Sequence, residues 1–275
     1  MERRPHAAER DPRASTPSLA HDGYAVHRNV FTPTEMSALV RDIEVADDRK
    51  PHPDILSQGA LRFSSNLLPF SDELRAFAAQ ERLVDLVCDH LGPDIWVRWD
   101  QAVAKGPGAP EFPWHQDNAY NLVRGEHLQV WVAINDSFAD NGALWVLPGS
   151  HHRLREHRIV GEWRELVDPP DEDEAQCIPA ATGDVVLFSS YLAHRTRPNT
   201  TTTTRWAYVL EYFPLSRYDP FVTPPYFVAA RRGVPCPGYV RWYRGRLSPW
   251  EQLHYLRRRL TVRVREGRWR REPGA

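Results

Sequence analysis

The chain is poor in cysteine and in long apolar stretches, and each shortage excludes a class of protein. Its three cysteines, Cys88, Cys177 and Cys236, lie far apart and form no C-x-x-C pair, so neither a disulfide framework nor a zinc knuckle is predicted. No apolar run is long enough to span a bilayer, and residues 1–22 lack the apolar segment of a secretory signal. We therefore expect a cytoplasmic protein with no membrane partner.

The chain also has few lysines and a net charge close to zero. The net charge of −1 argues against a protein that binds polyanions over its whole surface. Lys50 and Lys105 are the two lysines among 35 basic residues, which leaves 33 arginines; we interpret this bias as the base composition of a high-GC bacterial genome. What the chain has in quantity is apolar residues: 275 residues with 41% hydrophobic content can bury one sizeable core.

The C-terminal segment 241–275 is rich in arginine. It holds eleven arginines against three glutamates, a composition compatible with a nucleic-acid or anionic-carrier site. We favour a helical extension that starts at Ser248, buries Leu253, Leu256 and Leu260, and exposes its arginines. No RNA-binding, zinc-finger or basic-zipper pattern accompanies it, so we expect no nucleic-acid partner.

Two helical regions precede a series of short β-rich runs. Thr32 can cap a helix, with Pro33 at the first position and Glu35 completing a Thr-x-x-Glu capping box. A second helical region starts near Ser71 and stops at Gly92. A short strand is expected within 23–31, and the later β-rich runs are 95–104, 128–134, 144–147, 185–188 and 206–213. This order predicts a mainly β protein with flanking α-helices, built as a double-sheet jelly roll.

One domain is expected over 23–240, after a disordered tail of residues 1–22. Between 151 and 179 the strand pattern breaks into a charged segment that contains Trp163. A long unpatterned loop in a compact domain is either functional or simply solvated. We favour a lid over a substrate site.

A His-x-Asp triplet and a distant histidine can supply the ligands of an iron site. His115 and Asp117 are two residues apart, and a strand sends such residues to the same face. His194, at the end of another apolar, strand-like run, can be the third ligand. Two histidines and one carboxylate make the facial triad of non-haem Fe(II) oxygenases, which leaves coordination positions open.

Arg205 lies eleven residues beyond His194, at the start of a β-rich run. If the two strands pair as a hairpin, Arg205 returns beside the metal. Its planar guanidinium can bind a carboxylate through two parallel hydrogen bonds. The expected guest is 2-oxoglutarate, whose 2-oxo acid end would chelate iron while its distal carboxylate meets the arginine.

Taken together, these residues resemble the phytanoyl-CoA dioxygenase family of Fe(II)/2-oxoglutarate oxygenases. Further similar stretches occur in the family's order between about Gly23 and Phe213: 30–36, the run from Trp131, 141–144 with 148–151, and 183–185. The resemblance implies a double-stranded β-helix, a cupin-like jelly roll with the metal at its open mouth. It also implies Fe(II), 2-oxoglutarate and O2 as cofactors.

The resemblance assigns roles to residues around the triad. Those that match positions of the 2-oxoglutarate pocket are Lys105, Thr196, Gln116 and Trp131. A strand-end lysine is often just solvated, and a turn threonine can satisfy its own backbone, so Lys105 and Thr196 also have structural interpretations. The residues expected in a substrate pocket are Asn118, Tyr120, Trp145 and Arg153, each with a plain surface or core alternative.

The implied reaction is hydroxylation of an unactivated C–H bond in a small molecule of bacterial secondary metabolism, free or carrier-bound. Desaturation, epoxidation, cyclisation and epimerisation use the same iron site and remain open. Halogenation is excluded, since that branch has a small residue where Asp117 stands. Two more distant alternatives are a zinc hydrolase with the same ligands, which leaves Arg205 without a task, and a binding module acting through the arginine-rich tail.

Overall fold

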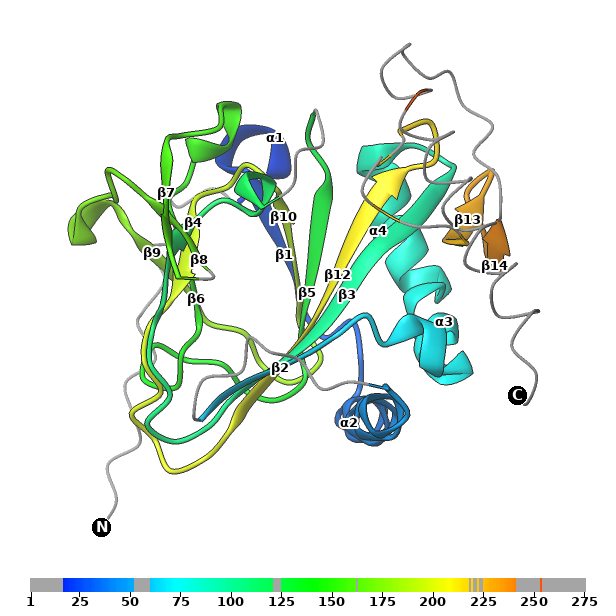
Figure 1. Cartoon of the computed structure of the whole chain (residues 1–275), viewed down its shortest axis with the longest axis horizontal. Coiled ribbons are helices and arrows are strands. Elements are labelled where there is room, and N and C mark those ends of the chain that lie inside the picture. The colour runs from blue at the N-terminus through cyan, green and yellow to red at the C-terminus, as the bar shows by residue number, and fades with distance from the viewer. Residues whose placement is uncertain are drawn as a thin grey trace, which may run out of the picture.

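The computed structural model describes residues 17–51, 60–120, 125–161, 163–217, 219, 222, 225–240 and 253, and its main feature is a pair of facing antiparallel sheets (Figure 1). The larger sheet has the order β1 (Tyr24–His27), β10 (Val185–Ser189), β5 (Leu128–Ala133), β12 (Arg205–Pro214), β3 (Ile95–Lys105), β13 (Tyr226–Arg231) and β14 (Val234–Val240), and β2 (Leu61–Ser65) also pairs with β3. The smaller sheet has the order β4 (Phe112–His115), β11 (His194–Thr196), β6 (Leu144–Val146) and β9 (Gln176–Ile178). Two facing sheets of this kind confirm the predicted jelly roll.

Helices cover the face of the larger sheet that points away from the smaller one (Figure 1). They are α2 (Pro33–Asp48), α3 (Asp72–Ala78) and α4 (Glu81–Leu91). The Thr32 capping box at the start of α2 is present with both of its hydrogen bonds, as predicted. The second helical region proves to be two helices, because the chain leaves helical geometry at Ala79 and Gln80 before α4 begins.

Strand alternation divides the larger sheet into two functional faces. On β12, Tyr208, Leu210 and Tyr212 point into the core shared with the helices, whereas Val209 and Glu211 face the smaller sheet and line a cavity. The two-residue period of a strand produces this separation. One face therefore stabilises the domain, and the other is available for a site.

The strands that carry His194 and Arg205 do not pair as a hairpin. β11 belongs to the smaller sheet and pairs with β4 and β6, whereas β12 belongs to the larger sheet and pairs with β3 and β5. The connection crosses between the sheets, and Asn199 holds it by donating from Nδ2 to the carbonyls of Lys105 (2.7 Å) and Thr203 (2.8 Å). Arg205 thus approaches the site from the sheet opposite His194.

The segment 151–179 is more regular than its sequence pattern predicts. After η3 (Ser150–His152) it forms a hairpin of β7 (His157–Val160) and β8 (Trp163–Leu166), then η4 (Glu172–Glu174) and β9, the edge of the smaller sheet. Short strands in charged sequence escape a search for apolar alternation. Because β9 belongs to the smaller sheet, the β7–β8 hairpin is the part of this segment that remains a candidate for the predicted lid.

The structure differs from the expectation at the N-terminal end of the described residues, and it does not test the predicted C-terminal extension. Residues 19–22 of the predicted disordered tail form the helical turn α1 (Leu19–Asp22), capped by the Ser18 side chain. Residues 1–16 and, apart from Leu253, the arginine-rich extension 241–275 lie outside the described residues. None of the helices that the structure describes has the length and apolarity needed to traverse a bilayer.

Gly183, in the turn before β10, offers a sharp test of this packing. Its φ is +86°, and an added Cβ would lie 1.9 Å from the Phe31 carbonyl oxygen. Phe31 cannot move away to relieve this clash, because its N–H donates to the Gly183 carbonyl at 3.0 Å. We expect Gly183→Ala to lower the free energy of unfolding by about 3–5 kcal/mol, measured by urea denaturation. Gly161→Ala is the matched control: φ is +59° with nothing within 4 Å, so about 1 kcal/mol is expected. Equal losses in both variants would contradict the close approach.

Candidate active site

Three side chains from distant parts of the chain converge between the sheets. Asp117 Oδ1 lies 3.4 Å from His115 Nε2 and 3.7 Å from His194 Nε2, and one ligand atom from each of the three residues lies within 4.8 Å of the others. His115 ends β4 and His194 begins β11, and the two are direct partners in the antiparallel ladder. The predicted convergence is therefore present, and strand register produces it.

The two imidazoles are oriented by their own backbone. His115 Nδ1 lies 2.8 Å from the Pro113 carbonyl oxygen, and His194 Nδ1 lies 2.9 Å from the Leu192 carbonyl oxygen. A carbonyl can only accept, so each Nδ1 carries the proton and each Nε2 keeps its lone pair directed toward Asp117. Such support fixes the tautomer that a metal ligand needs.

The charge states also suit a divalent cation. Burial lowers the pKa of His194 to about 4, with His115 nearby contributing in the same direction, so His194 is neutral at pH 7. Burial alone would raise the pKa of Asp117, but His194 and His115 outweigh it and hold the pKa below its usual value. A neutral His194 imidazole, the His115 imidazole and one carboxylate thus face a common point.

Gln116, between the two ligands, points out of the cavity. Its side chain is fully buried and hydrogen-bonds to backbone groups outside the cavity. Nε2 donates to the Arg153 carbonyl at 3.0 Å and to the Tyr191 carbonyl, and Oε1 accepts from Arg155 N–H at 2.7 Å. Gln116 is extended, whereas Asp117 starts the 3-10 helix η2 (Asp117–Ala119). Gln116 was predicted to contact the cofactor, but it is not among the residues that line the cavity. Its side chain instead positions the segment 153–155.

Arg205 lies in the same cavity, and its charge has no counter-ion there. The side chain is 1% exposed, Nη2 donates to the Gly142 carbonyl at 2.9 Å, and Nε and Nη1 have no hydrogen-bond partner. Its guanidinium carbon lies 5.7 Å from the Trp131 ring centre. Burial lowers the pKa of Arg205 to about 10, so the group remains charged at neutral pH. A buried, unpaired cation is costly, which indicates that an anionic ligand normally meets it.

Lys105 and Thr196 lie at the Arg205 end of the cavity. Lys105 is the ladder partner of Arg205 and donates from Nζ to Thr196 Oγ1 at 2.9 Å; Thr196 lines the cavity and Lys105 supports it from behind. Burial, together with the Arg205 charge, lowers the pKa of Lys105 to about 7. Gly142 is required here, since φ is +89° and a Cβ would lie 2.5 Å from Lys105 Cδ. The Asn141-Gly142 stretch therefore packs against both basic residues.

These observations fit the group that the sequence predicted. The triad offers two nitrogens and one oxygen, the donor set of a ferrous site with open positions, and Arg205 offers two unused donor nitrogens to a carboxylate. The residues that would hold iron are His115, Asp117 and His194, and those that would hold 2-oxoglutarate are Arg205, Thr196 and Trp131.

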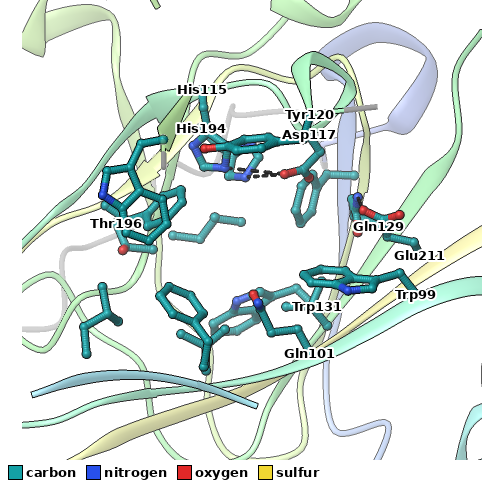
Figure 2. A pocket seen from close by; sticks show the side chains of 18 of the residues that line it. Trp99, Gln101, His115, Asp117, Tyr120, Gln129, Trp131, His194, Thr196 and Glu211 are labelled. Atoms are coloured by element: carbon teal, nitrogen blue, oxygen red, sulfur yellow. Dashed lines mark hydrogen bonds and ion pairs between the residues drawn. The ribbon is translucent and has the colours of Figure 1, made fainter. Parts of the chain in front are cut away.

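The cavity that joins these groups measures about 360 Å³, near the lower end of the range for small-molecule sites. Figure 2 shows His115, His194, Asp117 and Tyr120 along one side of it, with Trp99, Gln101 and Trp131 facing them. Its remaining walls come largely from apolar side chains, namely Leu61, Phe63, Val103, Phe112, Leu144, Trp163, Phe188 and Val209.

Of the four residues predicted for a substrate pocket, Tyr120 lines the cavity and the other three do not. Asn118 is buried behind η2 and donates from Nδ2 to the Gly125 carbonyl. Trp145 is on the outer face of the smaller sheet, where the Arg197 guanidinium carbon lies 3.7 Å from its ring centre. Arg153 contacts Gln116 through its backbone carbonyl. These positions result from strand parity and from the turn at η2, which reverses the side-chain direction after Asp117.

Sequence reasoning missed one wall of the cavity. Gln101, Gln129 and Glu211 are buried polar residues within strands that are mostly apolar. Each occupies an inward position of the two-residue period. A polar residue at such a position is a usable signal, because burial of an amide or carboxylate is unfavourable unless a partner or ligand meets it.

The hairpin β7–β8 closes part of the cavity mouth. The Trp163 ring centre lies 4.7 Å from that of Phe112, which in turn lies 4.6 Å from that of His115. The Tyr120 hydroxyl accepts from Arg164 N–H at 2.8 Å. Gln116 N–H also donates to His157 Nε2 of β7 at 3.1 Å. Aromatic contacts and two hydrogen bonds thus connect the hairpin to the residues around the triad.

Comparisons with known proteins agree with this geometry. A profile of the phytanoyl-CoA dioxygenase (PhyH) family matches residues 19–207. The chain is 26% identical over 215 residues to a probable alpha-ketoglutarate-dependent hypophosphite dioxygenase of Stutzerimonas stutzeri, covering 69% of this chain and 74% of that protein. It is 28% identical over 171 residues to a methylphosphonate hydroxylase of Gimesia maris, covering 60% and 63%.

Solved structures with the same arrangement include two enzymes of similar size. The epimerase SnoN, in complex with Fe3+, alpha ketoglutarate and nogalamycin RO, superposes with a TM-score of 0.65 at 18% identity, covering 80% of this chain and 93% of that one. The non-heme monooxygenase ThoJ superposes with a TM-score of 0.67 at 20% identity, covering 91% and 95%. At such identities the likeness establishes the fold.

Proposed function

Because the chain belongs to the phytanoyl-CoA dioxygenase (PhyH) family of Fe(II)/2-oxoglutarate-dependent dioxygenases, we propose that it hydroxylates an unactivated C–H bond of a small molecule in bacterial secondary metabolism. The observation that carries this proposal is the unpaired Arg205 guanidinium in the cavity that also contains the three ligand atoms. A metal hydrolase has no use for that cation. A 2-oxoglutarate-dependent enzyme requires an anchor of this kind.

Iron with 2-oxoglutarate and O2 supplies an oxidant strong enough for an unactivated C–H bond. The chain's own residues do the remaining work. His115, Asp117 and His194 would hold the metal on one side of the cavity. Arg205, supported by Gly142 and Lys105, fixes the orientation of the cosubstrate, while the aromatic and aliphatic walls position the substrate and limit access of water.

We further propose that the β7–β8 hairpin acts as the lid expected in the 151–179 segment. Trp163 contributes to the cavity wall, and Arg164 is bonded to Tyr120 beside the triad. A cover attached by two hydrogen bonds, from Arg164 N–H to Tyr120 and from Gln116 N–H to His157 Nε2, and by a few ring contacts can open without disturbing the sheets. The final part of the segment, β9, belongs to the smaller sheet and would stay in place.

The names of the relatives cover different substrates, among them hypophosphite, methylphosphonate and ectoine, and the structural relatives include an epimerase and a carbocyclase. Desaturation, epoxidation, cyclisation and epimerisation therefore remain alternatives to hydroxylation at the same site. Whether the substrate is free or carrier-bound stays a prediction, as does the cytoplasmic location.

Anaerobic titration tests the proposal directly. Adding Fe(II) and then 2-oxoglutarate to the folded protein is expected to produce a weak visible charge-transfer band, and a screen of candidate substrates is expected to show substrate-dependent release of succinate. Zn(II) in place of Fe(II) is the control and should give no band. A well-folded protein that gives no band with Fe(II) and 2-oxoglutarate would exclude the oxygenase site and restore the zinc-hydrolase alternative.

A further inference from the structure

One end of the cavity contains a row of side chains that the cofactors do not need. Gln129, Glu211 and Trp99 are direct ladder partners across three adjacent strands, β5, β12 and β3, and directly paired residues of an antiparallel sheet share a face. All three line the cavity, and Figure 2 shows them together. We call these three residues the acceptor row.

The acceptor row is separated from the cosubstrate anchor. Glu211 is six residues beyond Arg205 on the same strand, which corresponds to roughly 20 Å, farther than a five-carbon diacid reaches. Yet the row and the triad line the same cavity, where Figure 2 shows Gln129 and Glu211 between Asp117 and Trp99. A group bound at the row would therefore be beside the metal and away from the 2-oxoglutarate anchor.

A β-bulge brings a fourth residue to this end. The register between β12 and β3 shifts after Glu211, so that Glu211 pairs with Trp99 and Tyr212 pairs with Val97. Arg98 is the extra residue, and it lines the cavity beside Trp99 instead of facing the helices. Bulges next to active sites commonly redirect a side chain in this way.

Arg98 serves to hold the carboxylate of the row. Its Nη1 donates to Glu211 Oε2 at 2.8 Å, and its Nε pairs with Asp219. Burial would raise the pKa of Glu211, but Arg98 and His127 outweigh it and hold the pKa at about 2. Arg98 and Glu211 both line the cavity, whereas Asp219 is fully buried and does not. The carboxylate that a ligand in the cavity would meet at the row is therefore that of Glu211.

The row also has unused acceptor capacity. Gln129 is 1% exposed; its Nε2 donates to Glu211 Oε1 at 3.1 Å, and its Oε1 has no hydrogen-bond partner. The amide cannot be reversed, since its oxygen would then face the carboxylate. Glu211 Oε2 accepts from Arg98 and Oε1 accepts from Gln129, with His127 Nε2 3.9 Å from Oε1; a carboxylate has about four lone-pair sites, so it can accept a further donor. Trp99 adds an aromatic face of the kind that attracts cations.

We propose that the acceptor row is the specificity-determining subsite for the substrate of this enzyme, and that it binds a protonated amine. This inference rests on the proposed function. The ammonium group donates to Glu211 and to the Gln129 carbonyl and packs over Trp99, which places a neighbouring C–H bond toward the triad side of the cavity. Discrimination against carboxylates and phosphates of the same size comes from the Glu211 carboxylate and the Gln129 carbonyl, which accept hydrogen bonds and cannot donate them to an anion.

Three probes that differ in one group test this proposal: 2-phenylethylamine, 2-phenylethanol and 3-phenylpropionate. Binding to the full-length protein, saturated with Zn(II) and 2-oxoglutarate, is measured by ligand-observed NMR titration. The amine is expected to bind about tenfold more tightly than the acid, the size of one partly desolvated charge pair, with the alcohol between them. Tighter or equal binding of the acid would overturn the proposal.

Variants locate the preference. Glu211→Gln is expected to reduce the ratio of amine affinity to acid affinity to about one. Gln129→Met is expected to weaken binding of the amine several-fold. The matched control is Glu172→Gln, since Glu172 is an exposed carboxylate paired with Arg195 and Arg197 outside the cavity; it should keep the wild-type ratio. Retention of that ratio by Glu211→Gln would also overturn the proposal.

The thermal shift caused by 2-oxoglutarate distinguishes a failure of the acceptor row from a failure of the proposed function. If wild-type protein is stabilised by 2-oxoglutarate but shows no amine preference, the acceptor row is wrong and the proposed function stands. If it shows no stabilisation at all, the proposed function fails. A Glu211→Gln variant that does not fold leaves Gln129→Met to decide, and unchanged amine affinity in that variant counts against the row.

Discussion

His194→Ala is expected to lower the affinity for Fe(II) by more than about a hundredfold, since even residues that merely support a metal ligand are worth about 10- to 100-fold. The substitution removes one of three ligand atoms whose partners are already in place. His115 Nε2 and Asp117 Oδ1 remain 3.4 Å apart, but two ligands cannot define one face of an octahedral ion. Turnover of 2-oxoglutarate should fall to background.

Anaerobic calorimetry with Fe(II) measures this loss, and circular dichroism shows whether the fold survives. His152→Ala is the matched control, because His152 is exposed and contacts His151, away from the triad; its iron affinity should equal that of the wild type. Full iron affinity in a folded His194→Ala variant would show that the metal binds elsewhere.

Arg205→Met is expected to have opposite effects on binding and on stability. Loss of the charge partner should weaken 2-oxoglutarate binding by about 2–5 kcal/mol, equivalent to about 30-fold to several-thousand-fold. The ligand-free protein should melt at the same temperature or higher, because a buried cation without a counter-ion is replaced by an apolar chain of similar length. Iron affinity should not change.

Calorimetric titration with 2-oxoglutarate and thermal melting without it test both effects. Arg205→Lys keeps the charge but not the planar pair of donors, so an intermediate affinity is expected. Arg197→Met is the control, since Arg197 lies over Trp145 outside the cavity. Unchanged 2-oxoglutarate affinity in Arg205→Met, or a large drop in its melting temperature, would show that Arg205 is a structural residue.

Much of the candidate site could be predicted from the sequence because its chemistry depends on which residue types are present. A His-x-Asp triplet, a distant histidine and a later arginine specify a donor set and an anion partner wherever the chain places them. The first capping box and the five short β-rich runs were also predictable. Capping depends on residues three apart, and strand alternation on residues two apart.

The residues around the site were predicted less well. Gln116 and Trp145 turn away from the cavity and Asn118 is buried beside it, whereas Gln129, Glu211 and Trp99 line it. Neighbours in sequence need not share a face, and a single turn such as η2 or a single extra residue such as Arg98 reverses the direction of the side chains beyond it. No local pattern announces either change.

Local patterns were thus enough for the ligand chemistry, the cofactors they imply and the mainly β fold. Long-range pairing settled which strand carries Arg205 into the cavity and which wall faces the triad. Arg98 and Glu211 are 113 positions apart and Tyr120 and Arg164 are 44 apart. Contacts of this kind depend on which strands pair and in which register, and register is a property of the assembled sheets.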